Sequence, residues 1–205
     1  MRSTLINMNK DIFWDLIEKS KQNSEDLFEM AEILSKELIK YSEIEILHFE
    51  HIFRIYDEVA TASKLMALSS LLVGGLSEET FEYFKGWLIG MGKEIYLGTL
   101  KNLDSICEMG IDFEELSCDF EEIIYLGEQT YYEKLGINDG EIENYYKYKE
   151  AMEKNILDEK LVDEIFKEID AEKDLYNPIY EEKHEKSYEK LKETFPKTYK
   201  IIRGD

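Results

Sequence analysis

Apolar residues recur along most of this chain at intervals of three and four, which is the spacing of one face of an α-helix. Three such sets lie in the first third of the chain: Ile12, Phe13, Leu16 and Ile17; then Leu27, Ala31, Leu34 and Leu38; then Leu47, Phe53 and Tyr56. Capping residues stand in front of them, namely Asn9, then Asn23 or Ser24, then Ser42 in a capping box with Glu45. With only two prolines in 205 residues, the pattern predicts a mostly α-helical fold.

The stretch FEYFKGWLIGMGKEIY, residues 81–96, combines aromatic residues, glycines and lysines on one predicted helix that begins at Ser77. Its apolar residues form a single seam that we expect to be buried: Phe81, Phe84, Leu88, Met91 and Ile95. Gly86 and Gly90 lie on another face, where another helix is expected to approach the backbone closely. A phosphate-binding loop is excluded, because no Gly-x-x-x-x-Gly-Lys-Ser/Thr pattern surrounds Lys93.

These central residues resemble the signature of the bacterial family known as domain of unknown function 4240. The residues that carry the resemblance are Gly74, Gly75, Ser77, Phe81, Tyr83, Phe84, Gly86, Trp87, Leu88, Ile89, Gly92 and Lys93, with Phe13, Trp14, Leu16, Ile17, Phe49 and Glu50 before them. The resemblance covers roughly residues 8–136. It implies a helical fold and a bacterial origin, and it supplies no reaction.

We therefore expect a short leader at 1–7, one all-α domain of five or six helices at 8–136, and a charged helical extension at 137–205. Beyond residue 136 glycine becomes rare, and Tyr, Lys and Glu dominate. One amphipathic helix is expected in the extension, with Ile156, Leu161, Ile165, Phe166 and Ile169 on its apolar face.

Charge is the strongest global signal, with 46 acidic against 25 basic residues and a formal net of -21. Residues 103–145 hold 13 Asp or Glu and a single Lys, so this fifth of the chain carries a net of -12, more than half of the excess. Such a surface repels nucleic acid and anionic membranes, and it speeds encounter with basic proteins. Solubility alone is the competing explanation.

The acidic segment predicts a binding site for a basic protein partner, as in an immunity or inhibitor protein. Its expected residues are Asp112, Phe113, Glu114, Glu115, Asp119, Phe120, Glu121 and Glu122. The carboxylates would steer the encounter, whereas Phe113 and Phe120 would anchor the complex. No nucleic acid, membrane or cofactor is expected as a partner.

A cytoplasmic location is expected, because no secretory signal or membrane-spanning run is evident. Cys107 and Cys118 are too few for a disulfide framework and lack zinc or redox spacing. Cys107 also has no adjacent base to activate it as a nucleophile.

Two further sets of polar residues are candidates for chemistry. Glu50, His51, Arg54 and Asp57 recur at helical spacing, so they either pair with one another or line a pocket, to which Lys85, Trp87 and Lys93 are candidate additions. Glu45 with His48, and Glu181 with His184, form Glu-x-x-His spacings of the kind found in di-iron or di-manganese sites. A metal-binding protein or enzyme is thus the alternative to a binding protein, although no catalytic residue is predicted.

Overall fold

The computed structural model describes residues 8–75, 77–111, 113, 118–138, 140–173, 175–176 and 187–204. Throughout this part the regular structure is helical and no strand occurs, so the predicted all-α class is confirmed. The helices are α1 (Lys10–Gln22), α2 (Leu27–Leu38), α3 (Glu43–Ala60), α4 (Ser63–Val73), α5 (Glu78–Gly90), α6 (Lys93–Lys101), the 3-10 helix η1 (Leu103–Glu108), α7 (Glu121–Leu135), α8 (Ile142–Lys154), α9 (Glu159–Glu168), α10 (Ser187–Thr194) and α11 (Pro196–Arg203). More helices fall within 8–136 than the five or six that were expected.

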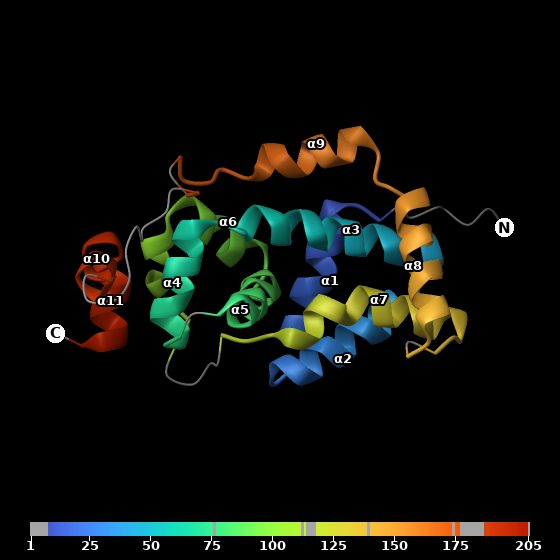
Figure 1. The fold of residues 1–205 in the computed structure, drawn as a ribbon, viewed down its shortest axis with the longest axis horizontal. Helices are drawn as coiled ribbons and strands as arrows, with labels where there is room; N and C mark the ends of the chain where they lie inside the picture. Colours follow the sequence, from blue (N-terminus) through green and yellow to red (C-terminus); the bar gives the residue numbers. More distant parts are fainter. Residues whose placement is uncertain are drawn as a thin grey trace. The chain divides into compact units, whose positions relative to one another are not determined.

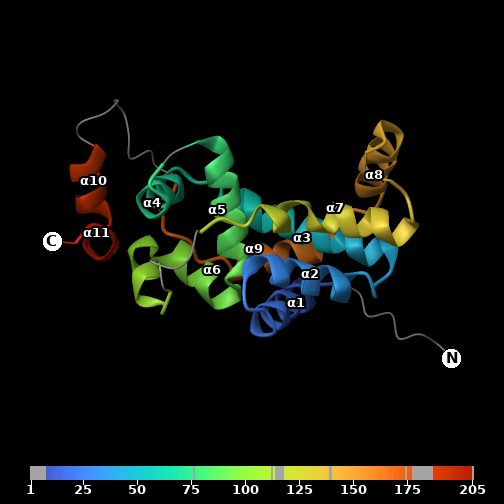
Figure 2. The same cartoon turned by 90° about the horizontal axis from the view of Figure 1, so that it is seen from below.

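The chain forms two compact units, and each combines an early segment with a late one (Figures 1 and 2). The first unit comprises Met1–Tyr56 and Glu122–Phe166, and the second comprises Asp57–Glu121 and Lys167–Asp205. Within residues 137–205, α8 belongs to the first unit, whereas α10 and α11 belong to the second.

Capping residues begin several helices where the sequence predicts them. The Asn9 side chain accepts hydrogen bonds from the backbone of Asp11 and Ile12 at the start of α1. At the start of α3, the backbone N–H of Ser42 donates to the Glu45 carboxylate at 2.9 Å, as in the predicted capping box. Helix α2 begins later than predicted, because Asp26 rather than Asn23 or Ser24 caps it.

The prediction of a single helix through residues 81–96 is wrong, because α5 ends at Gly90 and a second helix, α6, begins at Lys93. Gly92 has φ of 96°, a left-handed value that favours glycine, and it separates α5 from α6. The seam is consequently interrupted: Phe81, Phe84 and Leu88 are buried, whereas Met91 and Ile95 are only half-buried.

Aromatic side chains fill the first unit. Phe13 and Trp14 on α1 meet Phe49 and Tyr56 on α3, with ring centroids 4.8–5.6 Å apart. The Trp14 indole donates a hydrogen bond to the Tyr56 hydroxyl at 3.0 Å, so this buried polar pair is satisfied.

A second aromatic cluster in this unit joins α7 to α8. Tyr148 lies 5.7 Å from both Tyr131 and Tyr132, measured between ring centroids, and all three side chains are buried. The cluster explains why α8 packs on α7.

In the second unit, α5 supplies the buried side chains of Phe81, Phe84, Trp87 and Leu88. The late segment packs here as well: Leu175 is fully buried, and the Tyr176 hydroxyl donates to the backbone carbonyl of Val59 at 2.9 Å. Among the described residues, no helix combines the length and the apolar character needed to cross a membrane.

Candidate functional site

The acidic segment is only partly visible. Asp112 and residues 114–117, which include Glu114 and Glu115, lie outside the described residues. Asp119, Glu121 and Glu122 are exposed. Glu121 and Glu122 open α7, where negative charge also stabilises the positive end of the helix.

The two predicted aromatic anchors face inward, which corrects the expectation for Phe120. Its side chain is fully buried, and its backbone N–H donates to the Tyr83 carbonyl at 3.2 Å. Phe113 is half-buried, with its ring centroid 6.4 Å from that of Trp87. Because its apolar side chain is removed from water, Phe120 stabilises the fold, and it is not available to a partner.

Helix α7 presents an acidic edge that no cation among the described residues neutralises. We define the α7 edge as Glu122, Tyr125, Gln129 and Glu133, which are all exposed and follow one another at helical spacing. Among the described residues, the carboxylates of Glu122 and Glu133 meet no hydrogen-bond donor or cation. Lys134 does not balance them, because its ammonium group donates to the Ile39 carbonyl.

Helix α8 differs, since two of its three carboxylates are paired within the helix. Glu143 pairs with Lys147 at 2.9 Å, and Glu150 pairs with Lys154 at 2.5 Å. Glu122 and Glu133 therefore differ from Glu143 and Glu150, whose charges are balanced by lysines of the same helix.

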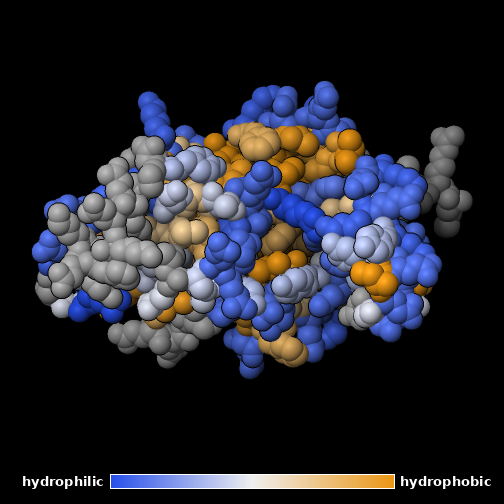
Figure 3. Space-filling view, in the orientation of Figure 1, coloured by the Kyte–Doolittle hydropathy of each residue, from blue (hydrophilic) through white to orange (hydrophobic). Residues whose placement is uncertain are grey.

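Exposed apolar and aromatic side chains of the first unit offer anchors in place of Phe113 and Phe120. Tyr125 on the α7 edge is 46% exposed, and Tyr146 on α8 is 65% exposed. Ile142, Ile156 and Phe166 are also more than half exposed. Figure 3 shows a mainly hydrophilic surface over α8 with a small apolar area in it, and a larger apolar area where α9 lies.

Glu50, one of the predicted pocket residues, is a buried carboxylate in the first unit. Arg54 donates to it from Nε at 2.7 Å and to the Tyr148 hydroxyl from Nη2 at 3.3 Å. The side chains thus pair, as one of the two sequence interpretations predicted, and His51 bonds instead to the Met152 carbonyl at 3.0 Å. Burial raises the pKa of the Glu50 carboxyl above its usual value, and the neighbouring Arg54 only partly opposes this effect.

The raised pKa predicts a pH dependence of stability. Folded Glu50 holds its proton more tightly than unfolded Glu50, so its favourable contribution is complete below the unfolded pKa of about 4.5 and is lost as pH rises through the folded value. Urea unfolding of the wild type and of Glu50→Gln should show that the wild type loses more stability over this window. Parallel pH profiles would contradict the prediction.

The remaining predicted pocket residues lie in the second unit. The Lys85 ammonium is buried and meets Asp57 and Glu82, each at 3.0 Å, and Thr61 at 2.8 Å. Because these groups surround it, Lys85 is not available to a ligand, which corrects its assignment to a pocket.

Lys93 and Trp87 also belong to the second unit. Lys93 pairs with Glu168 at 2.8 Å. Trp87 is fully buried, and its indole N–H meets no acceptor among the described residues. Both therefore contribute to packing, and the structure gathers no open cluster around them.

Of the two Glu-x-x-His spacings, only Glu45 with His48 lies among the described residues. The Glu45 carboxylate bonds to the Ser42 hydroxyl at 2.7 Å, which accounts for it without a metal. Within the described residues no group of three or more His, Cys, Asp or Glu side chains has metal-binding geometry. Glu181 and His184 lie outside that part, so their role stays a prediction for elemental analysis.

Several residues that the structure brings together were missed from the sequence. Tyr148 comes from the extension and completes the Glu50 pair, and Asp104 meets the start of α11. Pro196 before Lys197 was a usable signal, because proline favours the first position of a helix. No signal in the sequence indicates that Tyr148 contacts Arg54 or that Asp104 contacts the start of α11.

Comparison with known proteins identifies a family. A family model described as "Protein of unknown function (DUF4240)" matches residues 8–133, well over half of the chain. The match confirms the resemblance drawn from the central aromatic and glycine residues. Neither a curated protein nor a solved structure matches the chain.

Proposed function

The chain belongs to the DUF4240 family of proteins of unknown function, and from its surface we propose that it is a binding protein that captures a basic protein partner. The form we propose is a bacterial, cytoplasmic immunity or inhibitor protein. Toxins that act on nucleic acid need basic surfaces to bind their substrate, and an acidic protein can cover such a surface.

The α7 edge is the observation that carries the proposal. Glu122 and Glu133 meet no cation among the described residues, whereas Glu143 and Glu150 of α8 are paired with lysines. Unpaired carboxylates leave a local negative potential that attracts basic groups and accelerates association. Tyr125 sits between them, four positions before Gln129 and three after Glu122, and tyrosine is a frequent source of interface affinity.

The experiment uses the full chain as bait in its native host, followed by mass spectrometry and by association kinetics with the purified partner. We expect a protein of high isoelectric point. The double variant Glu122→Gln/Glu133→Gln should lower the association rate constant roughly tenfold at low salt and flatten its salt dependence. Tyr125→Ala should mainly raise the dissociation rate constant.

The matched control is Glu143→Gln/Glu150→Gln, which removes the same charge from α8. Since those carboxylates are already paired with lysines, this control should change the association rate less. Equal effects of the two double variants would show that net charge alone matters. An unchanged association rate constant in Glu122→Gln/Glu133→Gln would show that the acidic segment serves solubility only.

A further inference from the structure

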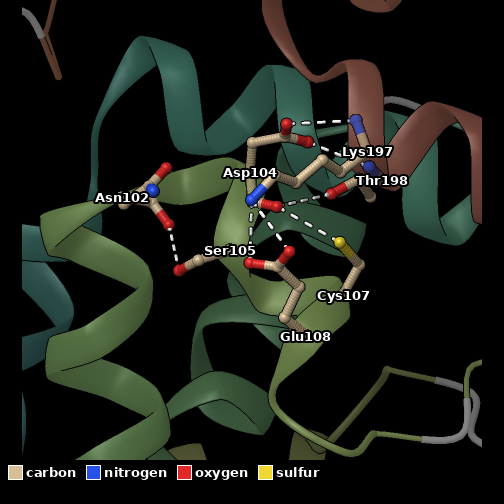
Figure 4. Close-up of polar contacts among 7 residues, drawn as sticks. All are labelled: Asn102, Asp104, Ser105, Cys107, Glu108, Lys197 and Thr198. Atoms are coloured by element: carbon tan, nitrogen blue, oxygen red, sulfur yellow. Dashed lines mark hydrogen bonds and ion pairs between the residues drawn. The ribbon is translucent and has the colours of Figure 1, made fainter.

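A polar clasp joins η1 to the start of α11 in the second unit (Figure 4). The two carboxylate oxygens of Asp104 accept hydrogen bonds from the backbone N–H groups of Lys197 at 3.0 Å and Thr198 at 2.9 Å. The Lys197 ammonium reaches along η1 and binds both carboxylate oxygens of Glu108, at 2.8 and 2.9 Å. Beneath them, the Cys107 thiol donates to the Asp104 carbonyl at 3.2 Å. The two carboxylates of η1 thus meet three donor groups of α11, and the Thr198 hydroxyl also donates to the Asp104 backbone carbonyl at 3.5 Å.

Helix α11 does not cap itself. Phe195 occupies the N-cap position without a side-chain hydrogen bond, and Pro196 follows it. With only eight residues, an isolated helix of this length is unstable in water. Asp104 supplies the missing acceptor, so the contact with η1 stabilises the first turn of α11.

The two sides of the clasp carry opposite charge. Lys197, Lys200 and Arg203 are the charged residues of α11, and the helix contains no acidic residue. η1 contributes Asp104 and Glu108 and has no basic residue. α11 is thus a short basic helix seated on an acidic support.

The support and its occupant come from different parts of the chain. η1 lies within residues 8–133, which the family model matches, whereas α11 lies beyond them. The acidic support is therefore part of the region that defines the family, and the basic helix is not.

We propose that η1 is a binding site for the N-terminal turn of a basic helix, and that α11 occupies this site from within its own chain. The recognised features are free N–H groups in the first turn, which Asp104 caps, and a lysine in that turn, which Glu108 binds. For an external partner, the proposal rests on the proposed function. It specifies that the partner presents a basic helix whose first turn is uncapped, and that this helix must displace α11.

The test disables α11 and supplies it again as a peptide. Tyr199→Pro removes the backbone N–H that donates to the Phe195 carbonyl at 2.8 Å and prevents the helix from forming. An unlabelled peptide of residues 195–204 is titrated into the isotope-labelled full chain, and the amide signals of η1 are followed by NMR. We expect saturable shifts at Asp104, Cys107 and Glu108 in Tyr199→Pro, and none at the same concentrations in the wild type, where the site is filled.

Two variants test the chemistry of recognition. Adding Asp104→Ala to the Tyr199→Pro chain should raise the peptide Kd about threefold to thirtyfold, the range measured for losing a helix cap. Asp170→Ala is the matched control, because it breaks the exposed pair with Lys101 and leaves the clasp intact. A peptide with Lys197→Glu should bind more weakly than the original, since it places a carboxylate against Glu108.

The absence of η1 shifts in a folded Tyr199→Pro chain would overturn the proposal. It would leave the proposed function standing, since the α7 carboxylates are tested by separate variants. If Tyr199→Pro does not fold, the test is thiol labelling of Cys107 in full-length Cys118→Ser, with or without Asp104→Ala. Release of α11 removes the Thr198 side chain that lies beside this half-buried thiol, so the labelling rate should rise, and an unchanged rate would overturn the proposal.

Discussion

Gly127→Ala is expected to lower the free energy of unfolding by about 3 kcal/mol or more, measured by urea denaturation. A Cβ at this position of α7 would overlap with Oε2 of Glu50 and lie 3.1 Å from its Cβ. The carboxylate has little freedom to move, because it is 3% exposed and bonded to Arg54 at 2.7 Å. Relief of the overlap therefore requires α7 to shift or the buried pair to break.

Gly98→Ala is the control for this prediction. Its added Cβ would meet only the end of the Met109 side chain, at 2.7 Å from Cε, and that flexible group can move aside. Alanine also favours a helix over glycine by up to about 1 kcal/mol, so a net change within about 1 kcal/mol is expected. The double variant Glu50→Ala/Gly127→Ala should be no less stable than Glu50→Ala, since the overlapping carboxylate is then gone. Additive losses would contradict the account.

The early helices were predictable because their signals are local. Asn9 and the Ser42–Glu45 box mark helix starts through bonds to residues two or three positions away, and a periodic apolar face follows each of them. The break at Gly92 was missed because the apolar spacing continues across it. The left-handed backbone conformation of Gly92 ends α5 and lets α6 start in a new direction, and the spacing of apolar residues carries no sign of this.

The candidate site was harder to predict, because it depends on contacts between distant residues. The acidic segment was visible from composition, but composition does not tell which aromatic residue within it faces inward. Phe120 is buried and Tyr125 is exposed, although both stand among carboxylates. In the same way, Tyr148 completes the Glu50 pair from 94 positions beyond Arg54. Such pairings are set by how the helices pack, and no single segment encodes them.

The contacts show which carboxylates of the acidic segment are already paired, which a count of charges does not tell. Residues 103–145 carry a net charge of -12, but only some of their carboxylates are paired with groups of the same chain. Asp104 and Glu108 are engaged by α11, whereas Glu122 and Glu133 meet no cation among the described residues. A basic partner would therefore encounter the α7 edge directly, and would reach η1 only after α11 has been released.

Phe84→Ala is expected to lower the free energy of unfolding by about 3 to 5 kcal/mol. The Phe84 side chain is fully buried in α5, and its ring centroid lies 5.4 Å from that of Trp87, so its removal deletes apolar area and leaves a cavity beside a second aromatic ring.

Phe28→Ala is the matched control, because Phe28 on α2 is 62% exposed and loses little packing. We expect it to change stability by less than about 1 kcal/mol. Urea denaturation should be followed both by circular dichroism and by tryptophan fluorescence, since Trp14 and Trp87 lie in different units. A loss below about 1 kcal/mol in Phe84→Ala, or an equal loss in Phe28→Ala, would show that α5 is not the packed centre of the second unit.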